Sequence, residues 1–386
     1  MHIGVYFWGS IFIDDAGVGG ADPYSRFATP QQCAELYSAL VDWAKLADDR
    51  GYESFWLTEH HFQREGYQII PNVSLISAVL AQHTRRISFG SFFLQVPTWH
   101  PVRLAEDFAM ADIMSGGRAL LGVGRGSVKR EAETFGAGFG RGGDAGDQKN
   151  RDLFDEQMEI IRKALTEREF SHRGDHYVIP AEGQTNTGGL NARPWDRVSL
   201  IPKPIHPFKI YQPVTSEQTF HDAAKHGHLA VVPFFSVDRT MPRWKMFGEL
   251  AEKYQGRKLR PGEDRMLVVQ VHLAGSKQEA IERFRPAHDE RQRFLAQQRP
   301  IPGYADEAGQ PFPIGRAPTL EESMAQANWL VGSAAEVTEK LIAVRHAFSL
   351  ESLAIEIGFS GLSKDVIAEQ IERFATEVRP ALESAT

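Results

Sequence analysis

The stretch from Ile87 to Val123, ISFGSFFLQVPTWHPVRLAEDFAMADIMSGGRALLGV, contains the unit from which this fold is built. An apolar run from Ile87 predicts a strand, and a second run from Ala119 predicts another. Between them, Pro101 opens a helical pattern and Gly116 ends it, as these residue types do at the two ends of helices. A strand, a helix and a second strand in this order predict two parallel neighbours in one sheet.

The same unit repeats along nearly the whole chain. We predict eight strands, which begin at His2, Glu53, Ile87, Ala119, Phe208, Leu229, Arg265 and Ser352. Seven of them are followed by a helical run before the next strand. The strands are continuously apolar, as expected when both faces of a sheet are covered. Eight such units predict a closed (β/α)8 barrel, or TIM barrel, with inserted loops. The alternative is an open doubly wound sheet, which has no reason to stop at eight strands.

Two irregular segments interrupt the pattern. The first, at about residues 171–207, is rich in Gly, Pro and Asn and is predicted to be an excursion that contains a hairpin. The second, at about residues 297–319, is long enough to predict a lid over the site. Because no internal repeat or linker divides the chain, we expect residues 1–386 to form a single barrel domain.

Composition excludes several classes of protein. Of 386 residues, 42% are hydrophobic and 24% are charged, which is typical of a soluble globular protein. A net charge of −7 does not indicate the excess of basic residues that is typical of nucleic-acid-binding proteins. The single cysteine, Cys33, excludes a disulfide framework and favours a reducing compartment. The first residues lack a secretory signal pattern, and no apolar run approaches the ~18 residues of a membrane span. We therefore expect a cytoplasmic protein.

The segment WLTEHHFQREG places three ionisable residues, Glu59, His60 and His61, directly after the second strand. In a (β/α)8 barrel the site lies at the carboxyl ends of the strands, so these residues are candidates for chemistry. Neighbouring side chains on an extended chain point in opposite directions, so His60 and His61 face the mouth together only if the chain turns. The helical His spacing and the Cys clusters of zinc sites are absent. An acid–base group and a loop histidine bonded to a carbonyl both remain open.

A glycine-rich turn follows the fourth strand. Its glycines alternate with other residues: Gly122, Gly124 and Gly126. Because Ser127 stands where the dinucleotide fingerprint requires a glycine, that motif fails. The tight turn still brings Arg125 to the rim of the barrel, where a guanidinium is suited to binding an anion. The alternative is a plain barrel loop in which Arg125 pairs with Glu131 or Glu133.

A helix start follows the fifth strand, in TSEQTFHDAAKHG. Ser216 can cap this helix, and Thr219 lies in its first turn. Free backbone N–H groups and the helix dipole make such a start a seat for phosphate, although capping alone also explains both hydroxyls. Because strands four and five are predicted neighbours, Arg125 and this helix start together predict an anion site.

Aromatic residues end the third strand. Phe92, Phe93 and Gln95 lie at the top of this strand in FFLQVPTWHP. They predict a slot for a flat, apolar ring, and the alternative is packing in the barrel core.

Several segments resemble the bacterial luciferase-like family of flavin-dependent monooxygenases. They are WLTEHHF, VPTWHPVRLAEDFAMADIMSGGRALLGVGRG and the Phe135–Gly136 pair, with weaker likeness at residues 216–227 and in the closing segment. The resemblance implies a (β/α)8 barrel that binds FMN at its carboxyl end. It also implies that reduced FMN reacts with O2 to a flavin C4a-peroxide that oxygenates a small apolar substrate, such as an aldehyde, a ketone or an aromatic compound.

The resemblance also implies roles for individual residues. His60 would be the acid–base residue, with Glu59 beside it as a second catalytic residue. The cofactor-binding residues would be Arg125, Ser216, Thr219, Phe92, Phe93, Gln95 and Gly124. A non-proline cis peptide is expected between Phe92 and Phe93. Light-emitting members carry a reactive cysteine where this chain has Gly124, so we expect oxygenation without light emission.

The resemblance further implies partners. Reduced FMN would come from a separate flavin reductase, because no dinucleotide fingerprint is present in the chain. A homodimer is expected, without metal, nucleic acid or membrane. Two alternatives stay open: a deazaflavin-dependent oxidoreductase that transfers hydride, and a non-catalytic flavin-binding protein.

Overall fold

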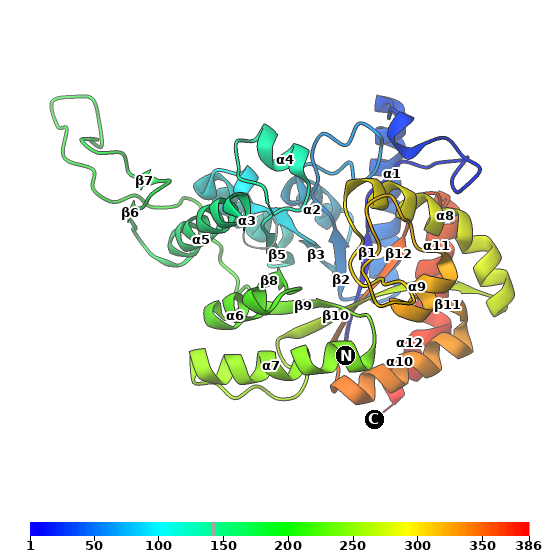
Figure 1. Cartoon of the computed structure of the whole chain (residues 1–386). Coiled ribbons are helices and arrows are strands. Elements are labelled where there is room, and N and C mark those ends of the chain that lie inside the picture. Colours follow the sequence, from blue (N-terminus) through cyan, green and yellow to red (C-terminus); the bar gives the residue numbers. More distant parts are fainter. Residues whose placement is uncertain (141–143, 386) are drawn as a thin grey trace.

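The computed structural model describes residues 1–140 and 144–385 and shows a closed barrel of parallel strands surrounded by helices (Figure 1). The barrel strands are β1 (His2–Phe7), β2 (Ser54–Leu57), β3 (Ser88–Ser91), β5 (Ala119–Gly124), β8 (Ile210–Pro213), β9 (Leu229–Pro233), β10 (Arg265–Ala274) and β12 (Ser352–Gly358). They pair in this order, and β12 pairs with β1 to close the ring. The predicted (β/α)8 barrel is confirmed, and the open sheet is excluded.

Helices cover the outside of the barrel (Figure 1). They are α1 (Pro30–Asp49), α2 (Val73–Gln82), α3 (Pro101–Ser115), α5 (Ala145–Thr166), α6 (Glu217–His226), α7 (Val237–Gln255), α8 (Lys277–Gln298), α10 (Ala334–Phe348) and α11 (Lys364–Arg373). Their ends follow local chemistry. Thr29 caps α1 in a capping box with Gln32, and Ser333 caps α10 in a box with Glu336. None of the described helices is long and apolar enough to cross a membrane.

The interior of the barrel holds large side chains in register. Tyr6 of β1 lies beside Trp56 of β2 on one side and Glu356 of β12 on the other. Trp56 is fully buried and stacks on Phe92, with ring centroids 4.1 Å apart. The interior is therefore packed below the mouth, and the space for ligands lies at the carboxyl ends of the strands.

The structure differs from the expected element pattern at several places. The third strand was expected to run without a break, but β3 ends at Ser91 and β4 (Leu94–Gln95) continues it beyond the Phe92–Phe93 peptide. That peptide is cis, which confirms the expectation. The last helix was expected to be continuous, but it consists of three consecutive segments: α11, a π-helical turn (Phe374–Val378) and α12 (Arg379–Ser384). Not expected were α4 (Lys129–Thr134), α9 (Leu320–Gln326) and β11 (Leu330–Ser333), all too short to show a period. Two single 3-10 turns lie at Pro23–Ser25 and Val96–Thr98.

The two irregular segments have different surroundings. The segment at 171–207 forms a small hairpin, β6 (His172–Arg173) with β7 (Val178–Ile179), and extends away from the barrel in Figure 1. The segment after α8 returns to the barrel, where Gly303 O accepts a hydrogen bond of 2.9 Å from Arg239 Nη1. Its Tyr304 and Phe312 are buried. This segment thus packs beside the end of β9, and its closure as a lid stays a prediction.

Candidate active site

His60 and Glu131 form a hydrogen-bonded pair at the mouth of the barrel. His60 follows β2, and Glu131 lies in α4, which follows β5. The distance from His60 Nδ1 to Glu131 Oε1 is 2.9 Å, and Oε2 lies 3.2 Å from the same nitrogen. Because an ionised carboxylate only accepts hydrogen bonds, Nδ1 carries a proton in both states of the ring, and in the neutral imidazole Nε2 is the acceptor. The imidazole can therefore take up a proton at Nε2.

Glu131 is buried, yet its neighbours keep it ionised. Burial alone raises the pKa of this carboxyl, but the hydrogen bond and charge of His60 and hydrogen bonds from Gln95 and Gln63 lower it below its ordinary value. Gln63 Nε2 donates to Oε1 at 2.5 Å, and Gln95 Nε2 donates to Oε2. Glu131 is thus a fixed negative charge that orients the imidazole ring.

Glu59 is buried and anchors the groups behind this pair. Its Oε1 accepts hydrogen bonds from Gln95 N at 2.8 Å and from Trp99 Nε1 at 3.0 Å. Its main-chain carbonyl accepts a bond of 3.0 Å from Gln95 Nε2, the same amide that reaches Glu131. The structure therefore connects Glu59 to His60 through Gln95 and Glu131.

His61 has partners different from those of His60. Its Nε2 lies 3.6 Å from Glu59 Oε1, and its ring packs edge-on against Phe135 with centroids 4.9 Å apart. The backbone turns at Phe62, where φ is 56°. Within residues 1–140 and 144–385, no cluster of His, Cys, Asp and Glu is arranged to hold a metal ion. The two histidines therefore meet different carboxylates, His60 that of Glu131 and His61 that of Glu59.

Arg125 follows β5 directly, and its ionic partner is Asp147 of α5. Arg125 Nη1 lies 2.8 Å from Asp147 Oδ1 and 3.4 Å from Asn150 Oδ1. The alternative pairing with Glu131 or Glu133 does not occur among the described residues. In that part of the chain the side-chain hydrogen bonds of Arg125 use Nη1, so the edge formed by Nε and Nη2 is suited to an anion.

The start of α6 follows the neighbouring strand, β8. Ser216 Oγ accepts a hydrogen bond of 3.4 Å from Thr219 N, and Thr219 Oγ1 accepts one of 3.1 Å from Ser216 N. Both hydroxyls therefore cap the helix. The cap uses the backbone N–H of Thr219, and the other N–H groups of the first turn can donate to a phosphate. Arg151 of α5 pairs with Asp222 of α6 at 3.5 Å. This pair holds the helix that carries the Arg125 partner next to α6.

Phe92 and Phe93 differ in their burial and in their contacts. Phe92 is buried on Trp56, whereas Phe93 is half-buried. A Cβ added to Gly124 would lie 3.2 Å from Phe93 Cβ, and one added to Gly122 would lie 1.8 Å from Ser91 O and 3.3 Å from the Phe93 ring. Glycine at both positions therefore lets β5 pass close to the segment from Ser91 to Phe93, where a larger residue would clash.

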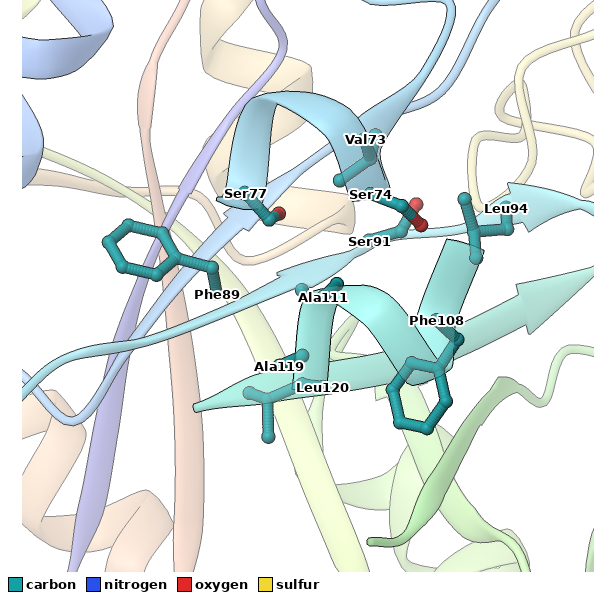
Figure 2. A pocket seen from close by; sticks show the side chains of 11 residues that line it. Val73, Ser74, Ser77, Phe89, Ser91, Leu94, Phe108, Ala111, Ala119 and Leu120 are labelled. Carbon is teal, nitrogen blue, oxygen red and sulfur yellow. The ribbon is translucent and has the colours of Figure 1, made fainter. Parts of the chain in front are cut away.

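A small cavity lies outside the barrel, between α2, α3 and strands β3 and β5 (Figure 2). Ser74, Ser77 and Ser91 line it together with apolar side chains (Figure 2). Its volume of ≈ 10 Å³ corresponds to about one water molecule. The cavity is too small for an organic ligand, and its lining contains no residue of the predicted site.

The groups at the mouth fit a flat cofactor with a phosphate tail. The Nε and Nη2 edge of Arg125 and the amides at the start of α6 suit a phosphate, and the half-buried ring of Phe93 suits contact with an aromatic ring. His60 presents Nε2 from the next strand along. These groups follow β2, β3, β5 and β8, at the end of the barrel where such enzymes bind their ligands. Fold and site thus match what a phosphorylated aromatic cofactor would need.

Sequence reasoning missed the part that Glu131 plays, because it considered this residue only as a partner for Arg125. The signal was present. Glu131 follows the fourth barrel strand, and a carboxylate at that end of a barrel is a candidate site residue. Which histidine it contacts depends on the path of α4, a helix of six residues.

Comparison with known proteins identifies the family. Residues 18–350 match the model of the luciferase-like monooxygenases. The chain therefore belongs to the luciferase-like monooxygenase family, and the resemblance seen in the sequence is confirmed.

Several relatives are similar over part of their length. The oxygenase component of the flavin-dependent trigonelline monooxygenase of Acinetobacter baylyi is 32% identical over 155 residues, 40% of this chain and 41% of that protein. The 4-hydroxyprotoasukamycin monooxygenase of Streptomyces nodosus is 27% identical over 250 residues, 63% of this chain and 60% of that protein. The chain thus spans less than two thirds of the length of these relatives.

Solved structures share the fold. The oxygenating constituent of 3,6-diketocamphane monooxygenase of Pseudomonas putida, in complex with FMN, has a TM-score of 0.73 at 23% identity and covers 99% of this chain and 98% of its own. An F420-dependent secondary alcohol dehydrogenase has a TM-score of 0.61 at 15% identity, with 99% and 98% covered. At these identities the likeness concerns the fold alone.

Proposed function

We propose that this protein is the oxygenase component of a two-component FMN-dependent monooxygenase. A separate flavin reductase supplies FMN in its reduced form, whose two electrons activate O2. One oxygen atom enters a small apolar substrate, such as an aldehyde, a ketone or an aromatic compound, and the other leaves as water. The name of the relative from Acinetobacter baylyi supports this assignment. Two further points stay predictions: that the protein is cytoplasmic, and that residues 1–386 form a single domain.

The observation that carries the proposal is the arrangement of His60 and Arg125 around the Phe93 surface. Arg125 and the start of α6 bind the phosphate, and Phe93 supports the ring. His60 takes or returns a proton at Nε2 while Glu131 holds Nδ1 at 2.9 Å. Glu59 and Gln95 position this pair. Aromatic walls limit the access of water, which favours transfer of oxygen to the substrate over its loss.

We further propose a homodimer that forms through α2 and α3. These helices lie side by side on the outside of the barrel (Figure 1). Together they expose large apolar side chains to solvent: Leu75, Val79, Met110, Ile113 and Met114. A second copy related by a two-fold axis would present the same face, so four helices would cover each other's apolar side chains.

Arg125→Ala tests the cofactor assignment. We expect the dissociation constant for FMN to rise at least tenfold, because a charged hydrogen bond to the phosphate is lost, about 1.5–3 kcal/mol. Fluorescence titration of FMN measures it, with Arg85→Ala as the control, since Arg85 is an exposed residue before β3. An unchanged constant in Arg125→Ala would refute the phosphate role.

His60→Ala tests the chemistry. We expect FMN affinity to be kept, while product formed per O2 consumed falls in single-turnover reactions of reduced FMN, O2 and a panel of apolar substrates. Reduced deazaflavin serves as a second arm. If hydride transfer from deazaflavin occurs and oxygenation with FMN does not, the oxidoreductase alternative replaces this proposal. If neither reaction occurs, the protein is a flavin-binding protein.

A further inference from the structure

A second polar cluster lies inside the barrel, on the wall opposite β5 and β8. Glu356 of β12 is buried and pairs with Arg291 of α8, whose Nη2 lies 3.2 Å from Glu356 Oε1. Gln270 of β10 donates to Glu356 Oε2 at 2.9 Å. Burial raises the pKa of the Glu356 carboxyl, against the opposing charge of Arg291. The function described above uses none of these three residues.

This cluster adjoins the proposed active site. Glu356 is in register with Tyr6 on the neighbouring strand. The ring of Tyr6 lies 5.4 Å from that of Phe92, and its hydroxyl is 2.6 Å from Thr58 Oγ1, two residues before His60. The cluster is thus one side chain away from the residues proposed to meet the cofactor ring.

The barrel is open at this level. Val268 and Gln270 of β10 point inward, and in a filled barrel both would be fully buried. Both are half-buried, as are Phe93 and Arg291. Solvent therefore reaches side chains inside the mouth both at Phe93 and on the wall that carries Arg291.

Arg291 is held in place but has an unused donor. Its guanidinium carbon lies 4.3 Å from the ring centroid of Trp8, 5.1 Å from that of Trp329 and 5.5 Å from that of Phe359. Three aromatic rings and one carboxylate fix its position. Within the described part of the chain, its buried Nε has no hydrogen-bond acceptor. The side chain as a whole is 12% exposed, so a ligand that brings an oxygen atom can reach the accessible edge of the guanidinium and accept a hydrogen bond there.

We propose that Arg291 binds a carbonyl oxygen of an otherwise apolar, neutral substrate; this inference rests on the proposed function. Neutrality follows from charge, because Glu356 already balances Arg291 and an anion would leave the buried group with a net negative charge. The aromatic rings around the guanidinium favour a planar carbon skeleton. Arg291 is then a residue that selects the substrate and positions its carbonyl group.

Three probes of nearly equal shape test this. Acetophenone carries the carbonyl, α-methylstyrene replaces its oxygen with carbon, and benzoate carries a negative charge. Binding is measured by tryptophan fluorescence on the full chain, with and without oxidised FMN, since Trp8 and Trp329 flank the site. We expect acetophenone to bind more tightly than both others. Equal affinities for acetophenone and α-methylstyrene would overturn the proposal.

Two variants sharpen the test. Arg291→Lys keeps the charge beside Glu356 but removes the planar guanidinium and its N–H donors, so acetophenone affinity should fall roughly ten- to a hundredfold. Glu356→Gln leaves Arg291 unbalanced, so the preference should shift toward benzoate. Arg293→Lys is the control, because Arg293 on the same helix bonds to Gly17 O and Ala21 O. Melting temperatures verify folding.

The outcomes separate the two proposals. If Arg291→Lys folds and binds acetophenone as the unaltered protein does, or if Glu356→Gln leaves the preference unchanged, the substrate inference is wrong while the FMN proposal stands. If acetophenone binds as expected but FMN does not bind, the FMN proposal fails and the carbonyl site stands.

Discussion

At the scale of single residues, Glu131 is the buried negative charge to which the polar side chains of the site donate their hydrogen bonds. Three donors converge on its carboxylate: His60, Gln95 and Gln63. In Glu131→Gln, the new amide NH2 would face one of these donors and leave it unpaired. We expect the free energy of unfolding at pH 7 to fall by about 1–3 kcal/mol. Urea unfolding measures this loss.

The pH dependence of the same variant has a defined sign. The hydrogen bonds lower the pKa of Glu131 in the folded protein, despite its burial. Its contribution to stability is therefore fully present above the unfolded pKa of about 4.3 and is lost as pH falls through the lower folded pKa. The gap in unfolding free energy between the unaltered protein and Glu131→Gln should narrow from about pH 5 to about pH 3. Glu133→Gln, exposed on the same helix, should show no such narrowing.

The sequence alone places candidate residues at the mouth but does not determine their partners. The end of β2 places Glu59 and His60 correctly, because strand direction and strand ends follow from the apolar pattern. Whether Arg125 meets Glu131 or Asp147 depends on how α4 and α5 leave the barrel. Each candidate pairing is chemically reasonable, and the choice is made by packing between segments far apart in the chain.

At the scale of elements, helix starts are predictable and short segments are not. The capping boxes at Thr29 and Ser333 lie where the sequence indicates, because each depends on residues three apart. The break between β3 and β4 has no local hydrophobic signal, and the cis peptide was expected only from family resemblance. Likewise, β11 forms because β10 extends beyond the barrel and offers it a free edge.

Two helices with the same type of cap allow the effect of a serine on stability to be distinguished from its effect on cofactor binding. Ser216 caps α6 at the proposed phosphate seat, and Ser333 caps α10 in the same type of box. Replacing either serine with Ala should cost about 1 kcal/mol of stability, because one helix donor loses its acceptor. Only Ser216→Ala should also weaken FMN binding, several-fold in a fluorescence titration. Equal FMN affinity in the two variants would show that Ser216 is a cap and nothing more.

At the scale of the whole molecule, the exposed apolar side chains of α2 and α3 indicate where a second subunit would bind. The barrel core satisfies its own strands and helices, so exposed apolar side chains that cluster on neighbouring helices are left without partners. Leu75 of α2 is 65% exposed, and Met114 of α3 is 53% exposed. A two-fold interface would bury each of them, and a stable one needs about 1,000 Å² or more.

Met114→Lys should convert the proposed dimer into a monomer. Symmetry places each substitution at the interface twice, so two buried lysines would oppose association, whereas the isolated subunit keeps the side chain in water. Sedimentation velocity at micromolar concentration should give twice the chain mass of 43.2 kDa for the unaltered protein and 43.2 kDa for the variant. Val18→Lys is the control, since Val18 is 77% exposed, more than Met114, but lies in the loop after β1. If the unaltered protein sediments as a monomer, or if Val18→Lys dissociates as readily as Met114→Lys, the face formed by α2 and α3 is not the interface.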